Sequence, residues 1–152
     1  MCSICRGHGY GSHANRPITA KLAAALTAQN IAFVAHDHRG HGYSDGDRAY
    51  FRTHEQMLSE WKTLIQSVRH PKSEECAAVL VEPSADVLDQ IATLPYFIMG
   101  QSMSGGLSVF LAEQLREDPL FLGAVLLSPA LQIMQLHFLL KWIFCYIAAP
   151  LY

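Results

Sequence analysis

Short apolar runs recur along the chain, each bounded by polar residues, glycine or proline. The clearest is Ile31–Ala35, which reads IAFVA and stops at His36. A continuous apolar run of this length is typical of a parallel strand buried on both faces. A second buried strand is predicted at Ala124–Leu127, and the runs 1–5 and 96–99 are predicted strands as well.

Segments with helical periodicity separate these strands. Between Pro17 and Gln29 the apolar residues expected to face the core are Ile18, Leu22, Ala25 and Leu26. Between Glu55 and Val68 they are Met57, Leu58, Trp61, Leu64, Ile65 and Val68. Further helices are predicted over 76–94, with an interruption near Pro83, and over 103–117. This alternation predicts an α/β fold in which helices cover both faces of a parallel sheet.

The chain divides into two predicted parts. Residues 1–129 form a partial α/β core, expected to be incomplete at both ends because the first strand is entered with no element before it. Residues 130–152 are strongly apolar, but four polar residues, Gln132, Gln135, His137 and Lys141, interrupt them. About 15 residues of cleaner apolar character remain, fewer than the roughly 20 that span a bilayer. An apolar cap or a membrane-touching helix is therefore preferred to a transmembrane span.

Composition adds limits on compartment and partners. The chain is 51% hydrophobic and 16% charged, as expected for one globular domain, and its net charge of −2 argues against a nucleic-acid partner. The four cysteines, Cys2, Cys5, Cys76 and Cys145, lack the density of a disulfide scaffold, so a reduced, cytoplasmic setting is expected. The CxxC at the start could also be a redox pair or half of a zinc site, against the simpler interpretation of a buried strand carrying thiols.

Ser102 carries the candidate chemistry. It lies in FIMGQSMSGG, directly after a predicted strand and before a predicted helix. A serine on such a sharp turn projects its hydroxyl above the sheet, and the helix start directs N–H groups towards an oxyanion forming there. The alternative is an ordinary helix N-cap made by Ser102 or Ser104. Ser104 also stands where the GxSxG pattern has glycine, which puts a fully formed turn in question.

Two glycine-rich loops follow the first two strands. The first, His8–Gly11, reads HGYG, and its backbone could supply a second oxyanion donor, although a plain tight turn is the alternative. The second, His36–Gly46, holds three histidines within six positions. We expect a structural role for this second loop, with Asp37, Ser44 and the glycines fixing it, in preference to a zinc site that lacks a helical or hairpin scaffold.

These motifs, in this order, resemble the monoacylglycerol lipase and lysophospholipase branch of the α/β-hydrolases. The resemblance rests on HGYG, HDHRGHGYSDG, FIMGQSMSGG and AVLLSPAL, and extends from His8 to Leu131. It implies that Ser102 is the nucleophile and that the backbone N–H groups of Tyr10 and Met103 form the oxyanion hole. It also implies hydrolysis of lipid-like esters through an acyl-enzyme, with no cofactor and no metal.

The same resemblance implies that the acid and the histidine of the triad follow the serine. The later acidic residues, Glu113, Glu117 and Asp118, belong to the helix after the serine, and the only later histidine is His137 in the apolar tail. We therefore expect the isolated chain to lack the triad acid and base and to be nearly inactive. The alternative is a non-catalytic protein that keeps the half-fold for binding or membrane association through 131–152.

Overall fold

The computed structural model describes residues 1–71 and 85–131. The predictions for 130–152, beyond Leu131, and for 76–84 of the interrupted helix lie outside these residues. The later part of that predicted helix is observed over 85–92. The described elements, in chain order, are β1 (Cys2–Gly7), α1 (Pro17–Thr27), β2 (Ile31–Ala35), α2 (His54–Arg69), α3 (Ala85–Ala92), β3 (Tyr96–Gln101), α4 (Met103–Leu115) and β4 (Phe121–Leu127).

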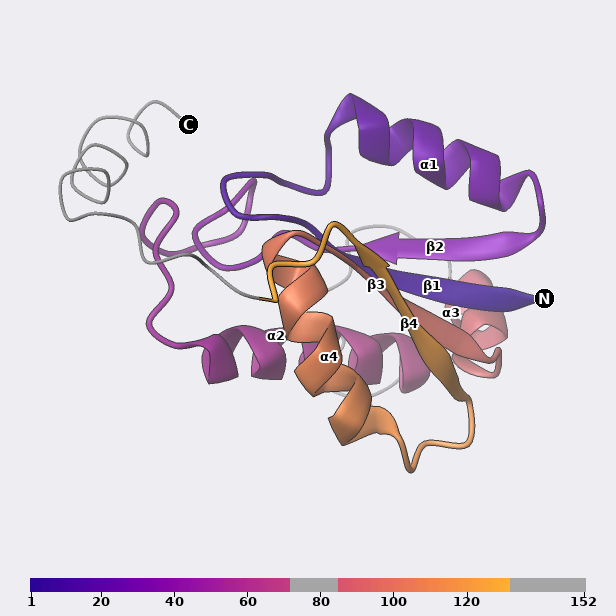
Figure 1. The fold of residues 1–152 in the computed structure, drawn as a ribbon. Coiled ribbons are helices and arrows are strands. Elements are labelled where there is room, and N and C mark those ends of the chain that lie inside the picture. Colours follow the sequence, from indigo (N-terminus) through magenta and orange to yellow (C-terminus); the bar gives the residue numbers. More distant parts are fainter. Residues whose placement is uncertain (72–84, 132–152) are drawn as a thin grey trace, which may run out of the picture.

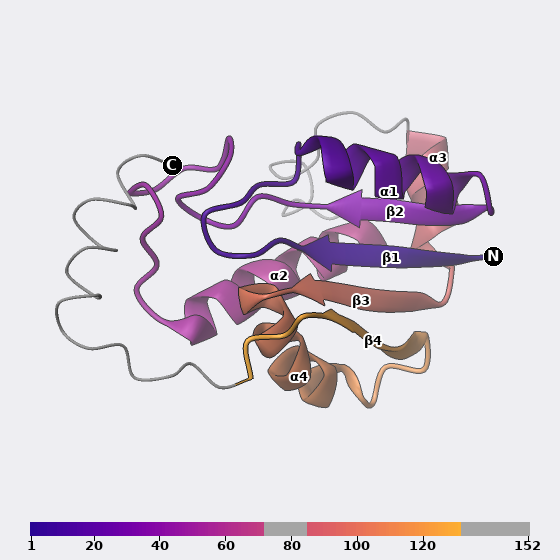
Figure 2. The same ribbon diagram turned by 45° about the horizontal axis from the view of Figure 1, so that its top comes forward.

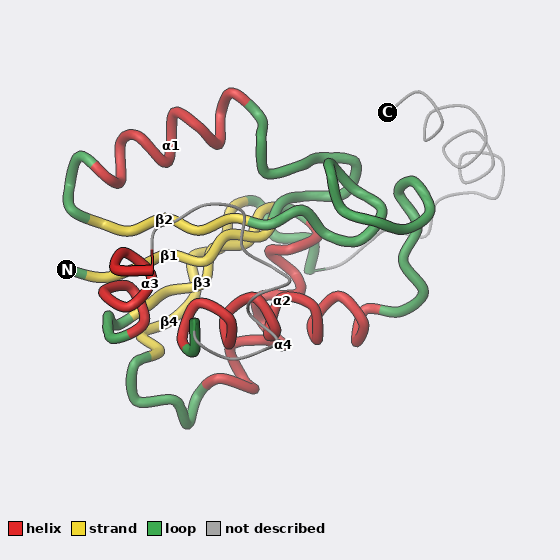
Figure 3. Tube along the Cα trace, turned by 180° about the vertical axis from the view of Figure 1, so that it is seen from behind, coloured by secondary structure: helices red, strands yellow, loops and turns green. Residues whose placement is uncertain are grey.

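The four strands form one parallel sheet in the order β2-β1-β3-β4 (Figure 2). Cys5 of β1 pairs with Val34 of β2 on one side and with Ile98 of β3 on the other. Because all strands run the same way, their carboxyl ends share one edge of the sheet. The loops after β1, β2 and β3 therefore gather at that edge, which is also visible from behind (Figure 3).

Helices cover both faces of the sheet, as predicted. Helix α1 lies over one face, and α2 and α4 lie over the other (Figure 1). The core between the sheet and these two helices contains Trp61, Ile98 and Leu111, none of which has any exposed surface. All six apolar positions predicted to face the core in α2 are buried. The parallel α/β fold predicted from the sequence is confirmed.

Two predictions of burial are wrong in detail. The outer strands are only partly covered: every residue of β2 is half-buried, and Leu122, Leu126 and Leu127 of β4 are exposed. In the described sheet each outer strand has a neighbour on one side alone, whereas β1 and β3 have two. The apolar run shows that a strand is suited to burial, but its position in the sheet decides how much burial it receives.

The covered face of α1 is also shifted from the prediction. Thr19 is buried and Leu22, Ala23 and Leu26 are half-buried, whereas Ile18 and Ala25 are exposed. Leu22 and Leu26 belong to both the predicted and the observed sets, and Thr19 and Ala23 take the place of Ile18 and Ala25, so the covered face is turned part of the way round the helix. Within the described residues, no helix is both long enough and apolar enough to cross a membrane.

Candidate active site

Ser102 occupies the bend between β3 and α4, at the carboxyl edge of the sheet. The residue is exposed, and its backbone has φ 53° and ψ −111°. A positive φ is rare for a residue with a side chain and costs on the order of 1–3 kcal/mol unless the surroundings hold it. The strand-to-helix turn predicted from FIMGQSMSGG is present, and it is strained at the serine itself.

Backbone hydrogen bonds hold this bend from the neighbouring strand. The N–H of Ser102 donates to the carbonyl of Leu127 over 2.9 Å. Its own carbonyl accepts from the N–H of Ala130 at 2.9 Å and from the N–H of Gly106 at 3.1 Å. The end of β4 and the segment after it therefore keep Ser102 in a conformation that it would rarely adopt alone.

The Ser102 hydroxyl does not cap the helix. Ser102 stands at the N-cap position of α4, but its side chain makes no capping hydrogen bond. Ser104 lies inside the first turn, so neither serine is the ordinary N-cap that the sequence left open. Met103 is the first helical residue, and the N–H groups of a first turn have no acceptor within their own helix. The exposed hydroxyl thus lies beside the positive end of α4.

The glycine-rich loop after β1 runs directly alongside Ser102. A Cβ atom on Gly9 would lie 3.2 Å from Cβ of Ser102 and 3.8 Å from its Oγ. Gly9 is buried, whereas Tyr10, the next residue, is 38% exposed. The two motifs that the sequence separates by about 90 residues therefore meet at one edge of the sheet, where the backbone of the first faces the side chain of the second.

Other glycines let α4 approach the sheet closely. A Cβ atom on Gly100 would lie 2.2 Å from the carbonyl oxygen of Ser104, and one on Gly105 would lie 2.7 Å from Cα of Pro129. Both distances are below those that real Cβ atoms adopt. The predicted close packing of the helix after the serine is therefore observed, and it depends on the missing side chains.

Ser104 replaces the glycine of the GxSxG pattern without disturbing the turn. Its side chain has no exposed surface and lies close against Gly7. There its hydroxyl donates to the backbone carbonyl of His8, and its oxygen lies 2.7 Å from Nε2 of His38. The extra side chain thus bonds to both of the loops that follow β1 and β2.

Two buried histidines, His8 and His38, and the half-buried His36 form a cluster beside that hydroxyl. Nε2 of His36 lies 3.1 Å from Nδ1 of His38, and the backbone N–H of His38 donates to Nε2 of His8 over 3.0 Å. Burial lowers the pKa of His8 and of His36 to about 4, and lowers that of His38 well below its ordinary value. All three rings are therefore neutral at pH 7.

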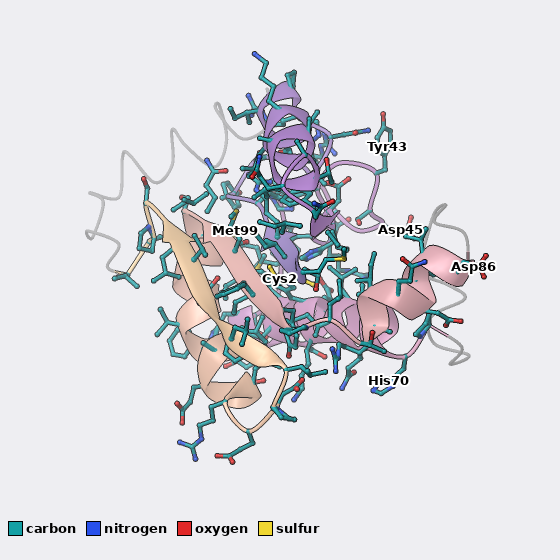
Figure 4. The ribbon with its side chains drawn as sticks, turned by 90° about the vertical axis from the view of Figure 1, so that its right-hand side faces the viewer. Cys2, Tyr43, Asp45, His70, Asp86 and Met99 are labelled. Atoms are coloured by element: carbon teal, nitrogen blue, oxygen red, sulfur yellow. The ribbon has the colours of Figure 1, made fainter. Side chains whose placement is uncertain are left out.

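The loop after β2 is fixed largely by Asp37. Its two carboxylate oxygens accept the N–H of Ala14 at 2.5 Å and the N–H of Tyr43 at 2.9 Å, and its carbonyl accepts the Ser44 hydroxyl at 2.6 Å. The Tyr43 side chain is turned away from the body of the molecule (Figure 4). These contacts support the structural role expected for Asp37 and Ser44. Within the described residues no group of three or more metal-ligating side chains is placed to hold an ion.

Sequence reasoning missed Arg6, a buried cation in β1. Its guanidinium donates to the Thr19 hydroxyl at 3.1 Å and to Oε1 of Gln101, the residue before Ser102, at 2.7 Å. Its Nε is buried without a hydrogen-bond partner, and burial lowers the pKa of the side chain. A charged residue inside the otherwise uncharged strand CSICRG was the available signal.

The remaining sequence candidates lie away from Ser102. Glu113 and Glu117 pair with Arg116 at the far end of α4, and Asp118 accepts the Tyr96 hydroxyl. His137 lies outside the described residues. Cys2 and Cys5 lie three positions apart in β1, which at about 3.3 Å per residue separates their Cα atoms by about 10 Å, too far for a disulfide. Cys5 is also buried, and burial raises the pKa of its thiol to about 12. The simpler interpretation of a buried strand carrying thiols is the correct one for Cys5.

Comparison with known proteins shows the family of the chain. Residues 3–150, nearly the whole chain, match the model of the family described as serine aminopeptidase, S33. The chain belongs to this family. The serine aminopeptidase family is a hydrolase family, in agreement with the resemblance drawn from the four motifs.

Proteins similar in sequence to this chain include monoglyceride and monoacylglycerol lipases. The mouse monoglyceride lipase is 28% identical over 122 residues, which are 80% of this chain and 33% of the relative. The monoacylglycerol lipase of Mycolicibacterium smegmatis is 30% identical over 106 residues, or 68% of this chain and 30% of the relative. The chain spans about a third of the length of these curated relatives.

Solved structures share the fold. The monoacylglycerol lipase of Paleococcus ferrophilus superposes with a TM-score of 0.64 at 20% identity, covering 96% of this chain and 48% of that one. A soluble variant of the monoglyceride lipase of Saccharomyces cerevisiae gives 0.63 at 19% identity, covering 99% and 42%. The chain therefore has part of an α/β-hydrolase fold, as the sequence predicted.

Proposed function

We propose that this chain carries the nucleophile and the oxyanion hole of a serine hydrolase that cleaves carboxylic esters. The observation that supports this best is the backbone of Ser102, held at φ 53° on an exposed bend with its hydroxyl not used for capping. A protein maintains such strain where the position of a side chain matters, and an ordinary helix start needs none. Membership of a hydrolase family supports the same conclusion.

In the proposed reaction, Oγ of Ser102 attacks the ester carbonyl and loses its proton to a base. The carbonyl oxygen becomes an oxyanion that accepts hydrogen bonds from the backbone N–H groups of Tyr10 and Met103. Collapse of this tetrahedral intermediate expels the alcohol, which takes up the proton, and leaves the acyl group on Ser102. Water then cleaves that ester bond, releases the fatty acid and restores the hydroxyl. The reaction requires no cofactor.

We further propose that the acid and the base of the triad are not supplied by the described residues. The carboxylates after Ser102 lie at the far end of α4, which at about 1.5 Å per residue is on the order of 20 Å away. Without a base the serine hydroxyl is a weak nucleophile at pH 7. Residues 1–152 alone should accordingly show little activity.

The proposed substrates are monoacylglycerols or lysophospholipid-like lipids. Several relatives are named monoglyceride or monoacylglycerol lipase, and this is the main support for the substrate class. Peripheral membrane contact through 131–152 stays a prediction, because that segment lies outside the described residues beyond Leu131. We also propose a cytoplasmic location, from the low density of cysteines in the sequence.

A fluorophosphonate probe tests the proposal on the longest protein product that contains residues 1–152. Wild-type protein should become covalently labelled at Ser102, and the Ser102→Ala variant should not. Ser108→Ala is the matched control, because Ser108 is another serine of α4 but is fully buried and donates to a carbonyl within the helix. It should be labelled like the wild type.

Absence of labelling in a folded, soluble wild-type protein would contradict the proposed enzyme. That result would favour the non-catalytic alternative, in which the half-fold serves binding or membrane association. Labelling that persists in Ser102→Ala would place the nucleophile elsewhere in the chain.

A further inference from the structure

The hydrogen bonds around Ser104 define where each proton of the cluster lies. The carbonyl of His8 can only accept, so the single hydroxyl proton of Ser104 is directed to it. His38 lies 2.7 Å from the same hydroxyl oxygen and must therefore donate from Nε2. Nδ1 of the neutral His38 ring is then an acceptor, and it lies 3.1 Å from Nε2 of His36.

The same reasoning fixes the His8 ring. Its Nε2 accepts the backbone N–H of His38, so in the neutral ring the proton must be on Nδ1. That Nδ1 lies 2.8 Å from the carbonyl oxygen of Gly9 and donates to it. A proton added to His8 or His38 would place two N–H groups face to face in this cluster.

The Gly9 carbonyl belongs to the same peptide unit as the N–H of Tyr10. Two donors hold this carbonyl: Nδ1 of His8 at 2.8 Å and the N–H of Ser12 at 3.1 Å. The described chain has no cis peptide bond, and a planar trans peptide directs its N–H opposite to its C=O. Fixing the Gly9 oxygen therefore fixes the direction of the Tyr10 N–H.

We propose that Ser104 is a positioning residue: through His38 and His8 it locks the Gly9–Tyr10 peptide so that the Tyr10 N–H faces the oxyanion formed at Ser102. This inference rests on the proposed function and adds residues to its machinery that do not touch the substrate. Ser104 acts on the His8 carbonyl directly, and it orients the His38 ring, whose own backbone N–H holds the His8 tautomer.

The site is built for a serine at this position. A Cβ atom on Gly7 would lie 2.8 Å from Oγ of Ser104 and 2.9 Å from Cη2 of Trp61, so the serine side chain fills the space beneath the strand. Removing the hydroxyl leaves two buried partners, the His8 carbonyl and the His38 Nε2–H, without hydrogen bonds. Unpaired buried polar groups are costly, so both loops should shift to recover partners.

Steady-state hydrolysis of p-nitrophenyl butyrate by the longest protein product tests the positioning role. Ser104→Ala should lower kcat about tenfold and leave KM within about twofold. Complete removal of an oxyanion donor lowers kcat roughly 100-fold or more, and the loss should be smaller here because the donor is displaced and not removed. Ser108→Ala is the matched control, because it also removes a fully buried hydroxyl from α4 but leaves the Gly9 loop untouched. Its kcat should equal that of the wild type.

A second measurement needs no variant and no turnover. Nitrogen-15 NMR of the histidine rings in the same wild-type product should find the proton of His8 on Nδ1 and that of His38 on Nε2. The reverse tautomer on either ring would overturn the inference even if Ser104→Ala fails to fold.

The two proposals fail in different ways. Turnover that depends on Ser102, with kcat equal in Ser104→Ala and Ser108→Ala, would overturn the positioning role and leave the proposed function standing. No Ser102-dependent turnover by the wild type would overturn the proposed function, and the positioning role with it.

Discussion

The hydroxyl oxygen of Ser104 lies 2.7 Å from Nε2 of His38, although 66 positions separate the two residues along the chain. This contact joins the first turn of α4 to the loop after β2, and the loop after β1 is joined to both. The three segments that surround Ser102 are therefore connected beneath it by buried side chains. Four predictions follow from the strain, the close contacts and the charges at this edge of the sheet.

Ser102→Gly should stabilise the protein relative to Ser102→Ala. Both variants lack the hydroxyl, but alanine keeps the Cβ atom that makes φ 53° unfavourable, whereas glycine adopts positive φ readily. Relief of strain of about 1–3 kcal/mol, less about 0.5–1 kcal/mol for the greater freedom of unfolded glycine, leaves a net gain on the order of 1 kcal/mol. Urea denaturation of the two variants measures it, and an alanine variant of equal or greater stability would show that the bend is unstrained.

Gly9→Ala should slow fluorophosphonate labelling of Ser102 about tenfold or more. The new methyl group would lie 3.2 Å from Cβ of Ser102, so the loop or the serine must shift, and small displacements of reacting groups reduce rates strongly. Gly123→Ala is the control: Gly123 lies in β4 with φ 148°, and the added methyl would meet no atom closer than 4.0 Å. The control should lose stability through strain and keep its labelling rate. Equal labelling rates in the two variants would contradict the close approach of Gly9.

The free energy of unfolding should fall as the pH decreases from about 6.5 to about 4. Burial lowers the pKa of His8 and His36 to about 4, so the unfolded chain, where histidine has a pKa near 6.5, binds more protons in this window. These histidines leave the free energy of unfolding at its full value above about pH 6.5 and reduce it as the pH falls towards 4. Arg6 and His41 also lower the pKa of His8, whereas Asp37 raises it.

Replacing one ring of the histidine cluster isolates its contribution to this pH dependence. The slope of the unfolding free energy against pH is proportional to the number of protons that the chain takes up on unfolding. His36→Gln should lower that number by about one, and urea denaturation at several pH values measures the slope. Glutamine retains an N–H that can donate to Nδ1 of His38. A slope that is unchanged in His36→Gln would exclude His36 as a source of the acid sensitivity.

Arg6→Met should leave the stability unchanged or increase it. Arg6 is buried with neutral partners alone and an unpaired Nε, and replacing a buried charge by an apolar side chain of similar volume is often neutral or stabilising. Arg6→Ala is the comparison, because it also removes the charge but leaves a cavity, and should lose about 2 kcal/mol or more. Thermal denaturation compares them, and a methionine variant as unstable as the alanine variant would show that the hydrogen bonds to Thr19 and Gln101 outweigh the cost of burying the charge.

Much of the fold follows from local pattern. The run IAFVA predicts β2 with its observed bounds, and the apolar positions of α2 predict its buried face without error. Both follow because strand and helix periodicity are properties of neighbouring residues. The strand-to-helix turn at Ser102 was predictable for the same reason, since an apolar run, a small-residue motif and a helical segment are contiguous there.

What lies outside local pattern was decided by tertiary structure. The partial exposure of β2 and β4 depends on the order of strands in the sheet, and the shifted face of α1 depends on which residues the sheet meets. The roles of Ser104, His8 and His38 depend on loops that are distant in sequence and meet only because parallel strands bring their carboxyl ends to one edge. A sequence specifies side chains and their periodicity, but a hydrogen bond between residues 66 positions apart exists only once the sheet has formed.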